Sequence, residues 1–123
     1  MFIGNNKLTN LIWIIDNNNL QLSGRVNEIM SLNPLDEKLR AFGFDVKVID
    51  GHNYDELMLS LRIDRNNLPS RPIAIIANTM RGKGVSLIEN KLGWHARKPN
   101  NEEFSIIFKQ LGMQVEAKDE KRI

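Results

Sequence analysis

The chain has 123 residues, 41% hydrophobic and 26% charged, which is the composition of one ordinary globular domain rather than of a disordered segment. Seventeen basic and fifteen acidic residues give a formal charge of +2, too small and too evenly spread to indicate a nucleic-acid or anionic-membrane partner. The absence of cysteine excludes disulfides, thiolate catalysis and zinc–thiolate sites. No apolar run reaches the ~18 residues of a membrane span, and the N-terminus does not resemble a signal peptide, so we expect a cytoplasmic location.

The first predicted strand is Leu11–Asp16, a short apolar run that we expect to be buried in a parallel sheet. The residues before it, Met1–Asn10, are expected to form at most the frayed end of a helix. Three asparagines follow Asp16, and the connection Asn17–Asn33 is predicted to be mostly irregular. Its length exceeds that of a usual connection, which favours a functional role.

The remaining predicted elements alternate between helix and strand along the chain: a helix Pro34–Phe42, a strand Phe44–Asp50, a helix Tyr54–Ile63, a strand Pro72–Thr79 and a helix Asn101–Leu111. The first helix is expected to open at Pro34 with Asn33 as its N-cap and to be closed by the glycine at position 43. In the second strand, alternation places Val46, Val48 and Asp50 on one face.

This alternation predicts an α/β fold, a parallel sheet with flanking helices and right-handed crossovers. The loops Asp16–Gly24, Asp50–Asn53 and Thr79–His95 then start at one edge of the sheet, the carboxyl edge, where ligands of such sheets bind. Carboxamide and backbone oxygens in the first loop suit a hard cation such as Mg²⁺, which keeps a phosphate and waters as further ligands.

Each candidate residue also has an alternative interpretation. Asparagines 17–19 are typical of turns as well as of a metal site. The segment RGKGVS is no Walker A motif, because Ala77 stands at the first glycine position and Gly84 follows Lys83; it is a flexible loop or a phosphate loop of another kind. His52 in DGHN is interpreted as a turn residue, whereas His95, after Gly-Trp, would place a titratable group near the site.

Four motifs in order, DNNNLQLSG, DGHN, RGKGVS and GWH, resemble those of transketolase, and more closely those of the N-terminal subunit of split transketolases. The resemblance runs from Phe2 to Leu111. It implies a partial transketolase-like, thiamine diphosphate-binding fold over residues 1–112, followed by a charged tail, 113–123. It also implies an enzyme that moves a two-carbon ketol unit between sugar phosphates with thiamine diphosphate and Mg²⁺, as in the pentose phosphate reactions.

The resemblance also implies site residues and partners. The metal ligands would be the side chain of Asn18 and the backbone carbonyl of Leu20, in agreement with the oxygen ligands of a hard cation. His95 would lie near the diphosphate and the reacting carbons, bind substrate and assist proton transfer. The DGH turn, Asp50 to His52, is interpreted as structural. The partner would be a C-terminal transketolase subunit, in a homo- or hetero-oligomer, with sugar phosphate substrates.

The chain departs from the family pattern at one important place. It contains no Gly-Asp-Gly, the triplet that starts the family's thiamine motif and supplies a metal-binding aspartate. Asn78 also stands where the family has lysine. We therefore expect the C-terminal half of such a subunit, inactive as an isolated chain. Two alternatives stay open: a non-catalytic remnant that serves as a module for subunit association, and a free-standing phosphate-binding module using RGKGVS.

Overall fold

The computed structural model describes residues 1–64 and 68–113 and divides the chain into two compact units. The first unit comprises residues 1–19 and 26–79, and the second comprises residues 20–25 and 80–123. Each is described by itself below. Among the described residues, no helix combines the length and the apolar character needed to cross a bilayer.

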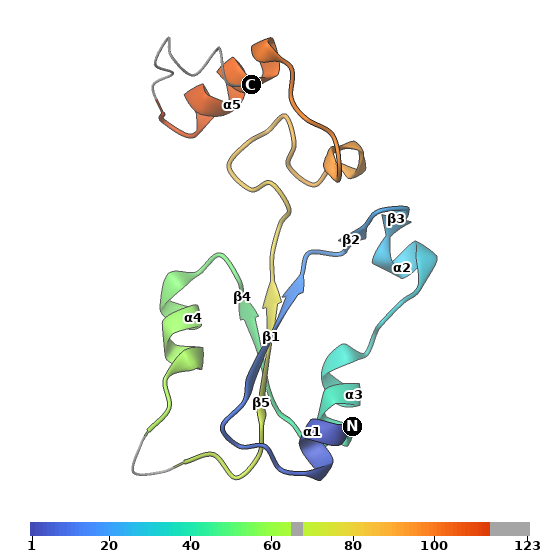
Figure 1. Cartoon of the computed structure of the whole chain (residues 1–123), viewed down its shortest axis with the longest axis vertical. Helices are drawn as coiled ribbons and strands as arrows, with labels where there is room; N and C mark the ends of the chain where they lie inside the picture. Colours follow the sequence, from blue (N-terminus) through green and yellow to red (C-terminus); the bar gives the residue numbers. More distant parts are fainter. Residues whose placement is uncertain (65–67, 114–123) are drawn as a thin grey trace. The chain divides into compact units, whose positions relative to one another are not determined.

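The first unit is built on a three-stranded parallel sheet (Figure 1). Its strands are β1 (Ile12–Asn17), β4 (Asp45–Asp50) and β5 (Ile73–Asn78), in the order β1-β5-β4. The register places Asn17, Asn78 and Asp50 at the same level, as the last residue of each strand. The three predicted strands, their direction and the common carboxyl edge are thereby confirmed.

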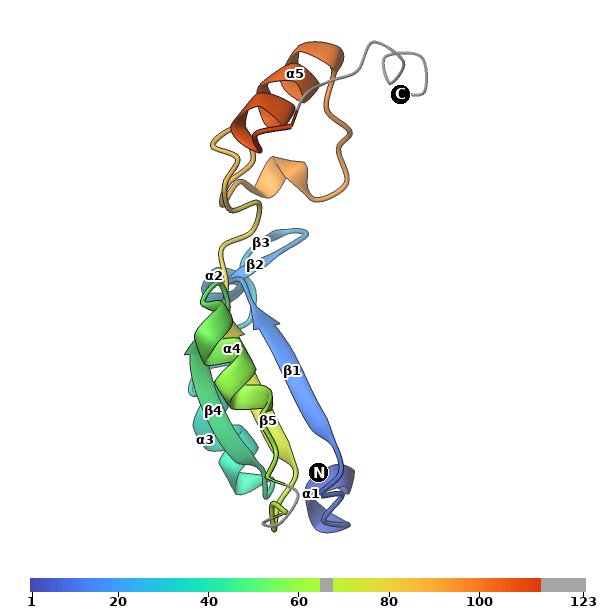
Figure 2. The same cartoon turned by 90° about the vertical axis from the view of Figure 1, so that its left-hand side faces the viewer.

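Helices cover both faces of this sheet (Figures 1 and 2). On one face lie α1 (Phe2–Asn5) and α3 (Leu35–Ala41), and on the other lies α4 (Tyr54–Leu61). Two apolar clusters mark these faces. The first holds Leu39, Phe44, Val46, Ala74 and Ile76, packed by Ile3, Ile15 and Leu35; the second holds Ile49, Ile73, Ile75 and Ala77, packed by Ile12 and Leu57.

Burial differs sharply between the central strand and its neighbours. Every residue of β5 before its last is buried, because β5 is paired on both sides and covered on both faces. In β1 the side chains of Trp13 and Ile14 are 44% and 50% exposed, so the expectation of a buried first strand is wrong: β1 is an edge of the described sheet. Val48 shares a face with Val46, as predicted, yet is 52% exposed, since β4 is the other edge.

The start of α3 also differs from the prediction. The N-cap is Pro34, in an extended conformation, and the helix begins at Leu35. Asn33 is therefore not the cap, and no side chain caps this helix. The backbone ψ of 111° at Pro34 delays the first helical residue by one position. The closing glycine is confirmed: Gly43 follows the C-cap with a φ of +90°, a conformation that costs glycine little.

The connection after β1 is more ordered than predicted. Residues Leu20–Gln21 (β2) and Gly24–Arg25 (β3) form a short antiparallel hairpin with a two-residue loop, and Val26–Ile29 form α2. Elements this short leave no periodicity to detect, because two residues per strand cannot show alternation. In the second unit a 3₁₀ turn, η1 (Leu92–Trp94), and α5 (Asn101–Gln110) follow. The predicted tail, apart from its first residue, lies outside the described residues.

Candidate functional site

Polar side chains join the ends of β1 and β5 at the carboxyl edge of the first unit. The Asn17 amide donates from Nδ2 to Oδ1 of Asn78 over 2.8 Å, and the Thr79 hydroxyl donates to Oδ1 of Asp16. The backbone N–H of Thr79 also donates to the carbonyl of Asn17 over 3.3 Å. The edge is thus held by bonds between residues 61 to 63 positions apart.

Asn18 is oriented by the same carboxylate. Its Nδ2 donates to Oδ2 of Asp16 over 3.2 Å, so the two oxygens of Asp16 serve two different donors. Asn19 then turns the chain with a φ of +59°, which asparagine tolerates well. Asp16 is therefore a residue that positions Asn18.

The donor set suits a hard cation only in part. An amide oxygen of Asn18 and, two residues on, the carbonyl of Leu20 are ligand types that Mg²⁺ accepts together with phosphate and water. Leu20, the first residue of β2, belongs to the second unit. Within residues 1–64 and 68–113, no three His, Cys, Asp or Glu residues are grouped so as to hold a metal. The correspondence is one of ligand type alone, the amide oxygen of Asn18 and the carbonyl oxygen of Leu20.

The turn after β4 is held by several hydrogen bonds. The backbone N–H of Asp50 donates to Oε2 of Glu56, and the N–H of His52 donates to Oδ1 of Asp50, each over 2.9 Å. The N–H of Gly51 donates to the carbonyl of Asn78 over 2.8 Å, which ties the turn to the end of β5. A Cβ on Gly51 would lie 2.5 Å from the Thr79 Cγ2. Glycine is needed here for close packing.

In the second unit, His95 follows η1 directly and is exposed. Its backbone N–H donates to the carbonyl of Leu92 over 3.3 Å. The preceding ring, Trp94, carries the Arg97 guanidinium 4.2 Å from its centroid, a cation–π contact. These interactions hold the backbone of the turn and leave the imidazole at the surface of the unit.

The same arginine connects this turn to α5. Arg97 forms an ion pair with Glu103, whose other carboxylate oxygen accepts from the backbone N–H of Asn100 over 2.9 Å. The Asn100 side chain accepts in return from the N–H of Glu103 over 2.8 Å, which completes a capping box. The hydrogen bond from the Asn100 backbone and the Arg97 guanidinium hold the pKa of Glu103 below its ordinary value of 4.5.

The segment RGKGVS forms a closed turn. The N–H of Asn90 donates to the carbonyl of Arg81 over 2.9 Å, and Gly82 and Gly84 have φ values of +70° and +92°. Val85 is buried, and the neighbouring Ser86 exchanges hydrogen bonds with Gln110. No helix follows the glycines directly, so the helix N-terminus that a phosphate loop uses is absent from this described segment. The rejection of Walker A agrees with this geometry.

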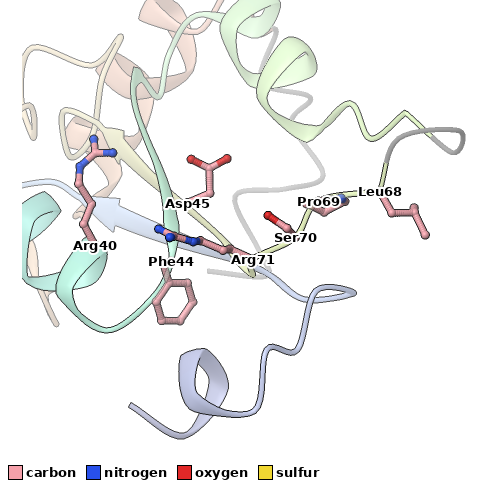
Figure 3. A pocket seen from close by; sticks show the side chains of 7 residues that line it. All are labelled: Arg40, Phe44, Asp45, Leu68, Pro69, Ser70 and Arg71. Atoms are coloured by element: carbon pink, nitrogen blue, oxygen red, sulfur yellow. The ribbon is translucent and has the colours of Figure 1, made fainter.

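The amino edge of the sheet carries a separate hollow of about 440 Å³ (Figure 3). It is lined by Arg40, Phe44, Asp45, Leu68, Pro69, Ser70 and Arg71. Since Asp45 is the first residue of β4 and the other lining residues come before β4 or β5, the hollow lies at the opposite end of the strands from Asp16. It is distinct from the candidate site.

Sequence reasoning missed two contributors to the site, Asn78 and Thr79. The sequence analysis noted Asn78 only as a departure from the family and Thr79 only as the end of a strand. Their bonds to Asn17 and Asp16 depend on the parallel register of β1 and β5. The signal that could have found them is that both strands end in polar residues at the same edge.

Comparison with known proteins agrees with this architecture. The model of the family "Transketolase, thiamine diphosphate binding domain" matches residues 1–120. The 6-deoxy-6-sulfo-D-fructose transketolase subunit of Clostridium sp. (strain MSTE9) is 41% identical over 102 residues, covering 83% of this chain and 37% of the relative. An apulose-4-phosphate transketolase subunit of Phocaeicola vulgatus is 36% identical over 111 residues, covering 89% of this chain and 39% of the relative.

A solved structure is similar as well. The transketolase from Campylobacter jejuni superposes with a TM-score of 0.80 at 29% identity, covering 92% of this chain and 17% of that chain. The 123 residues thus span less than two fifths of the length of these three proteins. Because the family model matches almost the whole sequence and the fold agrees, the chain belongs to the family of transketolase thiamine diphosphate binding domains.

Proposed function

We propose that this chain contributes the diphosphate-binding part of a split transketolase, which moves a two-carbon ketol unit between sugar phosphates in the cytoplasm. The observation that carries the proposal is the cluster of Asp16, Asn18 and Thr79 at the carboxyl edge of the sheet. Two relatives are named as transketolase subunits, which supports the proposal that the partner is a companion C-terminal subunit.

In this proposal Asn18 and Leu20 hold Mg²⁺, which in turn holds the diphosphate. Asp16 contributes by accepting a hydrogen bond from the amide nitrogen of Asn18, which fixes the orientation of that amide. Asn19 alone separates the two proposed ligands in the sequence, and both offer the oxygen atoms that Mg²⁺ prefers. Thiamine diphosphate, when bound, supplies the carbon nucleophile of ketol transfer, and the protein supplies orientation and electrostatics.

His95 is the proposed substrate-binding residue and proton carrier. Its imidazole is exposed, and its backbone is held by Leu92 and, through Trp94 and Arg97, by the start of α5. An imidazole has one ring nitrogen that can accept a proton and one N–H that can donate one, so it can carry a proton during the reaction. Replacement of His95 by Ala should lower turnover of the assembled enzyme by about 10²- to 10⁴-fold.

The experiment is a calorimetric titration of the 123-residue chain with thiamine diphosphate and Mg²⁺, with and without the companion subunit. We expect saturable, Mg²⁺-dependent heat that Asn18→Ala weakens by about tenfold or more, because an oxygen ligand is lost. The matched control is Asn27→Ala, an exposed asparagine of α2 in the same unit, which should bind as the unchanged chain does.

We also expect the 123 residues alone to show no ketol transfer, because they contain no Gly-Asp-Gly and the aminopyrimidine of the cofactor needs the companion subunit. Absence of heat both with and without the companion would contradict the proposed function. It would favour the alternative, a module for subunit association without a cofactor.

A further inference from the structure

The hollow at the amino edge of the sheet is formed by three segments of the first unit (Figure 3). The last turn of α3 contributes Arg40, the start of β4 contributes Phe44 and Asp45, and the approach to β5 contributes residues 68–71. The backbone N–H of Asp45 donates to the carbonyl of Pro72 over 2.9 Å, which holds the second and third segments together. The volume of about 440 Å³ lies within the range of about 300–1,000 Å³ that small-ligand sites have.

Arg71 brings a positive charge into this hollow. Its side chain is exposed and, within the part of the chain that the structure describes, forms no hydrogen bond or ion pair. In Figure 3 it extends from the start of β5 toward the side of the hollow that α3 forms. A guanidinium presents its N–H donors as a planar fork that matches the oxygens of a phosphate or a carboxylate. Arg71 can therefore anchor an anionic group in the hollow.

Arg40 adds a second guanidinium. It forms an ion pair with Asp36, in which Nε and Oδ2 are 4.0 Å apart and the two side chains are 51% and 42% exposed. An exposed pair at this distance contributes little stability, so Arg40 stays available to a ligand. Two guanidiniums match a phosphate monoester, whose charge is about −1.5 to −2 at neutral pH, better than they match a single carboxylate.

Asp45 and Ser70 set the chemistry of the rest of the ligand. Among residues 1–64 and 68–113, neither side chain has a hydrogen-bond or ion-pair partner. The Ser70 hydroxyl can donate to a phosphate oxygen, whereas the Asp45 carboxylate can only accept, and it repels a second anion. Hydroxyl groups on the organic part of the ligand would satisfy Asp45. The hollow thus fits a phosphate ester that also carries hydroxyl groups.

We propose that this hollow binds the phosphate ester of a small polyol, with Arg40 and Arg71 on the phosphate and Asp45 on the hydroxyl groups. The hollow lies at the opposite end of the strands from Asp16, so the inference goes beyond the proposed function and does not depend on it. A ligand held there connects α3 to the segment before β5 and stabilises the first unit by binding its folded state.

The test is a titration of the 123-residue chain with glycerol phosphate, the terminal ester, in the absence of thiamine diphosphate and Mg²⁺. Amide NMR should show saturable shifts at Asp45, Ser70 and Arg71. Inorganic phosphate should bind about tenfold more weakly, because it has no hydroxyl groups on carbon for Asp45. Glycerol at the same concentrations should cause no saturable shift, because it lacks the anion.

Variants separate the roles of the charged residues. Arg71→Gln should weaken binding of glycerol phosphate by about tenfold or more, and Arg71→Lys should lose less, since lysine keeps the charge without the fork. Asp45→Asn should narrow the preference for glycerol phosphate over inorganic phosphate, because it removes the repulsion of the smaller anion and a strong acceptor for the hydroxyls. The matched control is Arg62→Gln, an exposed arginine at the C-cap of α4 outside the hollow, which should bind as the unchanged chain does.

Circular dichroism verifies that each variant is folded. Asn18→Ala should leave the binding of glycerol phosphate unchanged, which separates this hollow from the proposed cofactor site. Absence of saturable shifts at tens of millimolar would overturn the inference and leave the titration with thiamine diphosphate untouched. Equal weakening by Arg71→Gln and Arg62→Gln, or equal affinity for inorganic phosphate and glycerol phosphate, would overturn it as well, because either result means attraction of anions without a site.

Discussion

Gly51 shows how little free space the carboxyl edge of the sheet contains. A Cβ at this residue would stand 2.5 Å from Cγ2 of Thr79, 3.0 Å from Cβ of Ala77 and 3.2 Å from the carbonyl oxygen of Asn78. Thr79 cannot easily move, since its hydroxyl donates to Asp16. The turn after β4 and the residues that orient Asn18 are therefore one packed group.

Gly51→Ala should lower the free energy of unfolding by about 1–3 kcal/mol, as overpacking does in other tight sites. Urea unfolding measures this change. The double variant Gly51→Ala/Thr79→Ser should recover most of the loss, because serine keeps the hydroxyl for Asp16 and removes the obstructing methyl group.

Gly93→Ala is the control, because it adds a methyl group to a glycine that has free space around its Cα. Nothing lies within 4 Å of a Cβ at that position, so the variant should be neutral or gain up to about 1 kcal/mol. Equal losses for Gly51→Ala and Gly93→Ala would contradict the packing argument.

At the scale of the elements, α5 is stabilised by its own first turn. Asn100 and Glu103 exchange hydrogen bonds in a capping box, and Glu102 and Glu103 place negative charge at the positive end of the helix dipole. Arg97 adds an ion pair and links this turn to Trp94. The start of α5 therefore also sets the position of the backbone next to His95.

The capping of α5 should depend on pH through Glu103. The Asn100 backbone hydrogen bond and Arg97 lower the pKa of Glu103 in the folded chain, so its stabilisation is complete above the ordinary value of 4.5 and is lost as pH falls through the lowered value. The protection factors of the amides in the first turn of α5, measured by NMR relative to the intrinsic exchange rate at each pH, should fall over that range.

Glu103→Gln, whose side chain cannot ionise, tests this pH dependence. Glu103→Gln should exchange faster than the unchanged chain at neutral pH and nearly equally once the carboxyl is protonated. Lys109, in the last turn of α5, offers a control: Lys109→Gln should keep the pH dependence. A difference between Glu103→Gln and the unchanged chain that persists at low pH would refute the assignment.

At the scale of the whole molecule, the first unit depends on its central strand. Residues Ile73 to Ala77 of β5 are buried between both apolar clusters, and Ile75 is completely buried. The edge strands β1 and β4 keep exposed side chains, among them Ile14. Unpaired strand edges of this kind favour pairing with an additional strand, from the same protein or from another molecule.

Ile75→Ala and Ile14→Ala form a matched pair, because Ile14 and Ile75 are partners in the register of β1 and β5. Ile75→Ala should lower the free energy of unfolding by about 2–5 kcal/mol through lost burial and a cavity. Ile14→Ala should lower it by about 1 kcal/mol, since half of the side chain is exposed. Urea unfolding of both variants measures the difference, and similar losses would show that β1 is covered in solution.

Local patterns in the sequence were enough to predict the parallel sheet and the helix α5. The apolar run Ile73–Ala77, the glycine after α3 and the acidic first turn of α5 each contain their signal within a few residues. Asn18 and His95 were identified in the same way, by motifs of the family, and their roles stay predictions. Signals of this kind survive without tertiary contacts because they arise from backbone conformation and short-range hydrogen bonds.

The exposure of Trp13, Ile14 and Val48 depended on which strand became central, and nothing within β1 or β4 encodes that order. The bonds from Asn78 to Asn17 and from Thr79 to Asp16 join residues more than sixty positions apart, and they exist because the parallel register sets both strand ends at one level. Pairing and burial are properties of the folded chain, because each requires two distant segments to meet.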